Sequence, residues 1–191
     1  MLVYRVFGHD PHAPAGEPGH EDFVYRPAQG ASRLDNASSY VTWYYGFTPE
    51  VAVGEAFGDL AQWSDDMFET PWLPTGRRVL GTFEIPDATP LLDLDDAANL
   101  VERSLRPTQV VTRVRSTSQS WALNIFREQR NGGRRWDGVR WWSYHRPQWT
   151  VFGIWTVDPD PPLHRLVKVE RLARTHPAVA SAQGTLAKLW H

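Results

Sequence analysis

Runs rich in β-branched and aromatic residues predict β-strands at several places along the chain. The two nearest the start are residues 2–7 (LVYRVF) and 40–45 (YVTWYY). Because successive side chains of a strand point to opposite faces, we expect one of Tyr44 and Tyr45 in the core and the other free to line a pocket. Further strands are predicted at residues 79–85, 137–143, 150–157 and 167–169.

A helix is predicted directly after the strand at 40–45. Thr48 can cap it, Pro49 suits its first position, and Glu50 favours the positive end of the helix dipole. Apolar residues then recur at helical spacing, so we expect the helix to run through residues 51–63.

Later helices are predicted from capping and periodicity. Ser116 and Gln119 form a capping-box pattern ahead of an apolar face, which predicts a helix over residues 116–130. Two more are expected at 93–105, capped by Asp93 or Asp95, and at 175–190. Because strands and helices are interspersed without a regular β-α-β order, we predict an α+β fold rather than a doubly wound sheet.

Length and charge describe an ordinary globular chain. We expect its 191 residues to form a single domain, 1–191, which is long enough to bury a core without disulfides. The formal net charge of -2 gives no general attraction to nucleic acid or to anionic membranes. The chain has no cysteine, no apolar run of membrane-spanning length and no signal-peptide pattern, so we expect a cytoplasmic protein. A homo-oligomer is left open.

Three histidines lie in or beside the Gly- and Pro-rich stretch 8–19, and two acids follow the last of them. His9, His12 and His20 together suggest a metal site. A loop without a regular element does not preorganise three ligands, however. We therefore expect no metal.

Glu55 is the first candidate for chemistry. Most helical glutamates simply face solvent. This one lies between Gly54 and Ala56, and no lysine or arginine stands three or four positions away to pair with it. A carboxylate among small residues can contact a sugar hydroxyl or face an oxocarbenium-like cation.

Arg33 and Ser143 each have a structural and a functional interpretation. Arg33 is either a loop arginine in water or a fork that holds phosphate. Ser143 ends the strand predicted at 137–143 and lacks the G-x-S-x-G pattern, which excludes a hydrolase nucleophile of that type. Its hydroxyl is either satisfied by backbone or positions a ligand.

Residues 134–149 (RRWDGVRWWSYHRPQW) interleave arginine with tryptophan. This composition fits a stacking surface for single-stranded nucleic acid, a sugar-binding platform, or a buried strand with cation–π contacts. Because the chain has no basic net charge, we favour the structural interpretation.

Several of these pieces stand in the order of known family motifs. An early Tyr4-Arg5 pair is followed by Ser32-Arg33-Leu34-Asp35, which is similar to G-R-F-[ND] with Ser for Gly and Leu for Phe. Residues 44–55 (YYGFTPEVAVGE) are similar to Y-x-A-x-[ST]-P-E-x-A-x-x-E, with Gly for the first Ala. Three later blocks follow: 118–122 (SQSWA), 137–143 (DGVRWWS) and 150–152 (TVF).

With these blocks the chain resembles the RES domain, which is named for an arginine, a glutamate and a serine. The matched blocks span residues 2–157, and 158–191 form a C-terminal extension of strand and helix. The resemblance implies a fold like that of ADP-ribosyltransferases and diphtheria-type toxins, with NAD in a cleft between two small sheets. It also implies NAD consumption by phosphorolysis, hydrolysis or ADP-ribosyl transfer. Many members are toxins neutralised by an antitoxin with a helix-turn-helix region.

The resemblance also implies residue roles. Arg33 would hold an NAD phosphate, and Arg5 is a second candidate phosphate contact. Tyr44 would line the nicotinamide side and is preferred to Tyr45 because its spacing to Glu55 matches the family block. Glu55 would contact the nicotinamide ribose and stabilise its oxocarbenium character, and Ser143 would position that end of the ligand.

Two other functions remain open. The first is a non-catalytic module that binds carbohydrate or single-stranded nucleic acid through residues 134–149. The second is a catalytically inactive RES relative that acts only through a partner.

Overall fold

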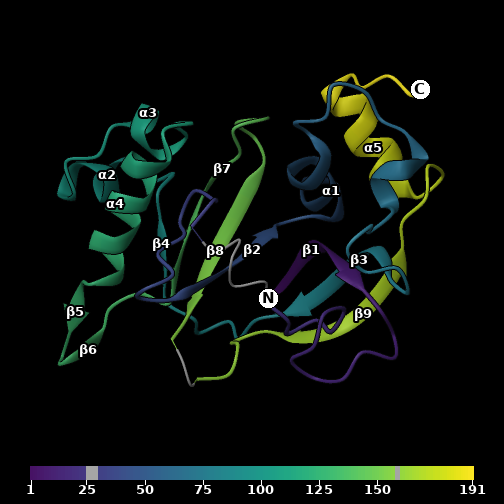
Figure 1. The fold of residues 1–191 in the computed structure, drawn as a ribbon. Coiled ribbons are helices and arrows are strands. Elements are labelled where there is room, and N and C mark those ends of the chain that lie inside the picture. Colours follow the sequence, from purple (N-terminus) through teal and green to yellow (C-terminus); the bar gives the residue numbers. More distant parts are fainter. Residues whose placement is uncertain (25–29, 158–159) are drawn as a thin grey trace. The chain divides into compact units, whose positions relative to one another are not determined.

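The computed structural model describes residues 1–24, 30–157 and 160–191 (Figure 1). They fall into two compact units. The first unit comprises residues 1–24, 45–85 and 164–191. The second unit comprises the described residues of 25–44 together with those of 86–163.

In the first unit three antiparallel strands lie in the order β1 (Leu2–His9), β3 (Arg77–Glu84) and β9 (Arg165–Arg171). Val3 opposite Phe83 marks the register of β1 on β3. The predicted strands at 2–7 and 79–85 are confirmed. Strand β9 is longer than the predicted 167–169, because pairing with β3 extends an edge strand whose own sequence is largely polar.

Helices α1 (Pro49–Phe57) and α5 (Pro177–Leu186) and the 3-10 turn η2 (Asp65–Phe68) complete this unit. As predicted, Thr48 caps α1, with its hydroxyl accepting from the Val51 N–H at 3.3 Å. The predicted extent of 51–63 was wrong, because α1 ends at Phe57. The core is built from both helices and from η2: Ala52, Val53, Phe57, Trp63, Phe68, Val179 and Ala182.

Trp63 explains why α1 stops early. Its side chain is fully buried in the core, and its indole N–H donates to the Phe57 carbonyl at 3.0 Å. Gly58 is the C-cap residue of the helix. The chain therefore turns back after Phe57 and uses Trp63 to cover the helix end instead of extending it.

In the second unit the strands lie in the order β4-β7-β8-β2. Strand β4 (Leu91–Asp93) is parallel to β7 (Gly138–Trp142), which is antiparallel to β8 (Thr150–Thr156). Strand β2 (Val41–Gly46) contributes its residues up to Tyr44. These strands confirm the predictions at 40–45, 137–143 and 150–157.

Three helices and a hairpin belong to the same unit: α2 (Ala97–Glu102), α3 (Pro107–Val110), α4 (Arg115–Phe126), β5 (Gln129–Arg130) and β6 (Gly133–Arg134). The predicted helix 93–105 was wrong at its start, because Asp93 ends β4 and Asp96 caps α2. The short α3 was not predicted.

The predicted capping box of α4 was also wrong. Val114 is the N-cap residue and has no side-chain capping bond, while the Gln119 amide donates to the Gly30 and Ser32 carbonyls at 2.8 and 3.0 Å. The helix ends at Phe126 rather than at residue 130 because the next residues form the β5–β6 hairpin. Together these elements confirm the predicted α+β class. In the part of the chain that is described, no helix has the length and apolarity needed to cross a membrane.

Candidate functional site

Arg33 lies in a loop that is tied to the start of α4. One of its terminal nitrogens, Nη1, donates to the Val110 carbonyl at 2.9 Å and to the Thr112 carbonyl at 2.6 Å. Val110 is the last residue of α3, and Thr112 lies in the connection from α3 to α4. The guanidinium group therefore has a structural task in this loop, and its contact with a phosphate stays a prediction.

Tyr44 and Asp35 hold the same loop from the strand side. The Tyr44 hydroxyl accepts from the Leu34 N–H at 2.8 Å and donates to Asp35 Oδ1 at 2.7 Å. Asp35 is 3% exposed, and its other oxygen accepts from the Gly30 and Ser32 N–H groups at 2.9 and 2.8 Å. Burial, followed by the negative charge of Asp35, raises the pKa of Tyr44 well above its ordinary value. The phenol stays protonated and fixes the loop beside Arg33.

Ser143 follows β7 and is buried. Its Oγ accepts from the His145 N–H at 2.9 Å, and its own N–H donates to the Trp149 carbonyl at 2.7 Å. The next residue, Tyr144, carries the Arg113 guanidinium 4.5 Å above its ring. Since Arg113 adjoins the Thr112 carbonyl that Arg33 binds, the second unit brings Arg33, Tyr44 and the Ser143 turn into one connected neighbourhood.

Glu55 lies on α1 in the first unit and is exposed. Gly54 and Phe57, close to Glu55 in the sequence, are buried on the core side of the helix. The helix thus presents the carboxylate to solvent from a rigid element. This placement agrees with a carboxylate that meets a ligand, and equally with an ordinary surface glutamate.

Arg5, also in the first unit, stands beside a hydrogen-bonded chain that the sequence did not indicate. The Tyr45 hydroxyl lies 2.6 Å from His164 Nδ1, and His164 Nε2 lies 3.1 Å from Asp22 Oδ1. Burial lowers the pKa of Arg5, and the neighbouring Tyr45 and Asp22 oppose that shift. Burial, and then the charge of Arg5, lower the pKa of His164 to about 4.

Burial and the charge of Arg5 thus keep the His164 imidazole neutral at neutral pH, so it can accept at one nitrogen and donate at the other. Tyr45, which is 3% exposed, is the core-facing tyrosine that the strand pattern predicted. The role of His164 had no local signal, because its partners come from residues far away in the sequence.

The histidine-rich N-terminal stretch shows no metal-ligand arrangement. In residues 1–24, 30–157 and 160–191, no group of three or more histidines or acids is placed to hold a metal ion. His9 instead has its Nδ1 3.1 Å from the Gly19 carbonyl.

Residues 134–149 have internal partners for the side chains that would make a binding platform. Trp141 and Trp149 are 4% and 8% exposed. The Arg134 guanidinium lies 5.2 Å from the Phe126 ring and pairs with Asp137, and Arg140 pairs with Asp93. These contacts favour the structural interpretation of the Arg/Trp-rich segment.

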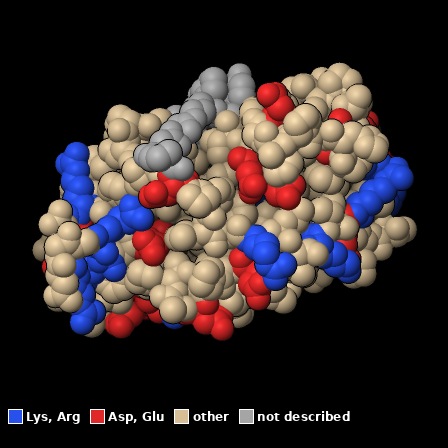
Figure 2. Space-filling view, turned by 90° about the horizontal axis from the view of Figure 1, so that it is seen from below, with Lys and Arg blue, Asp and Glu red and all other residues tan. Residues whose placement is uncertain are grey.

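Figure 2 shows both kinds of charge on the face in view: basic side chains gather along its left edge, and elsewhere basic and acidic side chains lie side by side. The structural interpretation of residues 134–149 therefore rests on the internal contacts of that segment.

The five predicted residues are divided between the units. Arg33, Tyr44 and Ser143 lie in the second, and Arg5 and Glu55 lie in the first. Each group has its own supporting contacts, described above. A pocket that combines both groups remains a prediction.

Comparison with known proteins decides the family. The model of the RES domain matches residues 2–177. The chain belongs to the RES domain family. The match extends past the predicted 2–157 and includes β9, and it ends at Pro177, the first residue of α5.

A solved structure shares the fold of this RES protein. One chain in the crystal structure of the M. tuberculosis MbcT–MbcA toxin–antitoxin complex aligns with a TM-score of 0.60 and 16% sequence identity. The alignment covers 98% of the present chain and 89% of the other. No curated protein matches the sequence significantly.

Proposed function

We propose that this RES protein consumes NAD by breaking the bond between nicotinamide and ribose. The observation that carries the proposal is the RES family match over residues 2–177, together with the ordered motif residues within it. The fold shared with a chain of a toxin–antitoxin complex supports a toxin as the biological role.

The reaction does not need a general acid to protonate the leaving group. When the C1–N glycosidic bond breaks, its electron pair goes to the cationic nicotinamide nitrogen, and nicotinamide leaves as a neutral molecule. The positive charge moves to the ribose as an oxocarbenium-like centre. The protein must therefore supply a nearby negative charge and a firm hold on the rest of the substrate.

Glu55 is the proposed negative charge. It stands exposed on α1, whose opposite side is anchored in the core of the first unit. A carboxylate held on a rigid element can stabilise the developing cation without reorganising. Ser143 and Tyr44 are proposed to position the nicotinamide end, and Arg33 and Arg5 to hold the pyrophosphate.

The acceptor distinguishes three reactions. Attack by a phosphate oxygen gives ADP-ribose 1-phosphate, attack by water gives ADP-ribose and a proton, and attack by a macromolecular nucleophile gives an ADP-ribosylated product. Each releases one nicotinamide. We propose NAD cleavage as the shared step and leave the acceptor to measurement.

The test is nicotinamide release by the purified chain with and without inorganic phosphate, followed by chromatography of the products. Glu55→Gln should lower the rate on the order of 10²–10³-fold, because it removes the charge opposite the cation. Glu50→Gln on the same helix is the matched control and should keep its activity, since an amide still accepts the Thr185 hydroxyl that Glu50 binds. An absence of release under both conditions, with no labelled acceptor in a lysate, would refute the proposal.

A protein antitoxin is the proposed partner, and the cytoplasm is the proposed location. Both follow from the toxin role, since NAD and a co-expressed antitoxin would be met there. A helix-turn-helix region in that partner is part of the same proposal.

A further inference from the structure

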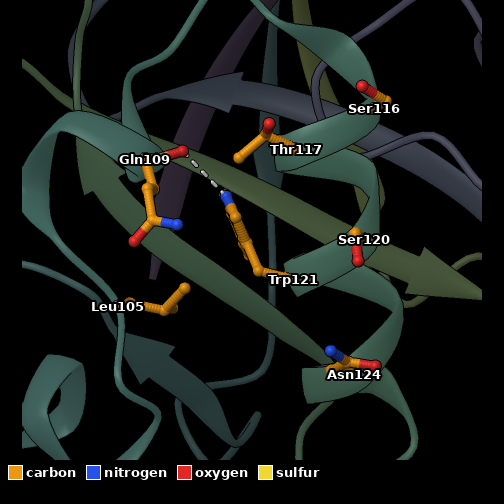
Figure 3. A pocket seen from close by; sticks show the side chains of 7 residues that line it. All are labelled: Leu105, Gln109, Ser116, Thr117, Ser120, Trp121 and Asn124. Carbon is orange, nitrogen blue, oxygen red and sulfur yellow. Dashed lines mark hydrogen bonds between the residues drawn. The ribbon is translucent and has the colours of Figure 1, made fainter.

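A cavity of about 440 Å³ that is open to solvent lies in the second unit, and none of the five residues of the proposed NAD site is among its lining residues (Figure 3). Helix α4 supplies Ser116, Thr117, Ser120, Trp121 and Asn124 to its lining, and Leu105 and Gln109 form the opposite wall. Figure 3 shows Thr117 and Trp121 projecting from α4 toward Gln109 and Leu105.

The walls of this cavity are held by hydrogen bonds. The Trp121 indole N–H donates to the Gln109 carbonyl at 3.0 Å, and Gln109 Oε1 accepts from the Arg106 N–H at 2.9 Å. The residues that follow Gln109 are held by Arg33, which donates to the Val110 and Thr112 carbonyls. A ligand would therefore meet a formed surface rather than one that must be ordered on binding.

The polar groups of the lining are neutral and reach solvent. Ser116, Ser120 and Asn124 are exposed and Thr117 is half-buried, so their hydroxyl and amide groups can exchange water for a ligand. Among the described residues no charged side chain lines the cavity. Hydroxyls both donate and accept, and an amide offers one group of each kind. Trp121 and Leu105 add apolar surface between them.

From this chemistry we infer a second binding site that takes an uncharged, hydroxyl-bearing small molecule of about nucleoside size. Hydroxyls of the ligand can exchange bonds with the serine, threonine and asparagine groups, while its ring packs on the apolar patch. The volume lies in the range of small-molecule sites. A charged ligand would find no counter-ion in the lining, so a phosphate group adds no favourable contact there. The inference does not depend on NAD cleavage.

Adenosine is the probe, and 5′-AMP is its charged counterpart. Saturation-transfer NMR detects binding to the full chain, and the shift of the assigned Trp121 indole N–H gives the dissociation constant. We expect adenosine to shift this resonance saturably, and AMP to bind no more tightly than adenosine.

Ser120→Trp places an indole in the cavity and should weaken adenosine binding at least tenfold. Ser181→Trp is the matched control, because Ser181 is an exposed serine on helix α5 of the other unit. Asn124→Ala removes one polar partner without filling the space and should weaken binding more modestly.

Three results would overturn the inference. Adenosine could fail to move the Trp121 signal at millimolar concentration, it could bind the Ser120→Trp variant as well as the parent, or AMP could bind tenfold more tightly than adenosine. The last result would assign the cavity to anions drawn by the first turn of α4. None of these results bears on nicotinamide release, so this inference and the proposed function can be refuted independently.

Discussion

Arg33 illustrates how one residue can carry two tasks. Its place in the motif implies a phosphate contact, while its Nη1 group is bound to the Val110 and Thr112 carbonyls. A guanidinium group has five N–H donors, so one that holds two carbonyls can also be proposed as a phosphate contact. A loss of activity on mutating Arg33 would therefore not by itself show a ligand contact.

Arg33→Ala should lower the free energy of unfolding by ~1.5–3 kcal/mol, because two carbonyls lose a charged donor. Urea unfolding without any ligand measures this. Arg127→Ala, an exposed arginine at the end of α4, should change the value by less than about 0.5 kcal/mol. Equal stability of the two variants would mean that the Arg33 contacts contribute nothing to folding.

His164 makes stability depend on pH. Its side chain is 2% exposed, and its pKa in the folded protein is about 4, below the ordinary 6.5. The unfolded chain therefore takes up a proton below about pH 6.5 that the folded chain takes up only near pH 4. This contribution is fully present above pH 6.5 and is lost as the pH falls toward 4.

The loss amounts to at most ~3 kcal/mol across that window. We expect the free energy of unfolding, measured with urea, to fall more steeply between pH 7 and pH 4.5 for the parent than for His164→Gln. The amide of the variant cannot titrate. Parallel curves for the two proteins would exclude His164 as the source.

At the scale of elements, local signals predicted where helices begin better than where they end. Thr48, Pro49 and Glu50 act within one turn, so the start of α1 is encoded locally. Its end depends on Trp63 folding back onto Phe57, which is a property of the core. A start signal can fail for the same reason, because Gln119, predicted to cap α4, instead donates to carbonyls of the loop before β2.

Helix α5, apart from its first residue, lies beyond the family match and packs against α1 through small side chains. Ala178, Val179 and Ala182 share one core with Ala52 and Val53. Ala182→Leu should destabilise the protein by about 1–3 kcal/mol through overpacking. Ala180→Leu on the exposed side of the same helix is the control. Thermal unfolding of both variants measures the difference, and an unchanged Tm for Ala182→Leu would show that the two helices are loosely packed.

For the whole molecule, the proposed role as an NAD-consuming toxin makes a prediction in cells. Induced expression of the chain in bacteria should arrest growth and deplete NAD, and Glu55→Gln should do neither at equal protein level. Growth arrest by the Glu55→Gln protein would separate toxicity from NAD cleavage and would favour a catalytically inactive relative that acts through a partner.

The α+β class, most strands and the family were determined by the sequence alone. Strand alternation, capping residues and ordered motif blocks are each written within a dozen positions, where backbone geometry and side-chain direction are coupled directly. The same local signals selected Tyr44, Glu55 and Ser143 as candidates.

Tertiary structure alone decided the partners of these residues. Arg33 binds a carbonyl 77 positions away, and His164 meets Asp22 across 142 positions. Such contacts arise because burying a charged or polar group requires a partner wherever the fold can supply one, and no short pattern records which residue that is. The neutral cavity beside α4 has the same origin, since its two walls come together only when Trp121 reaches the Gln109 carbonyl.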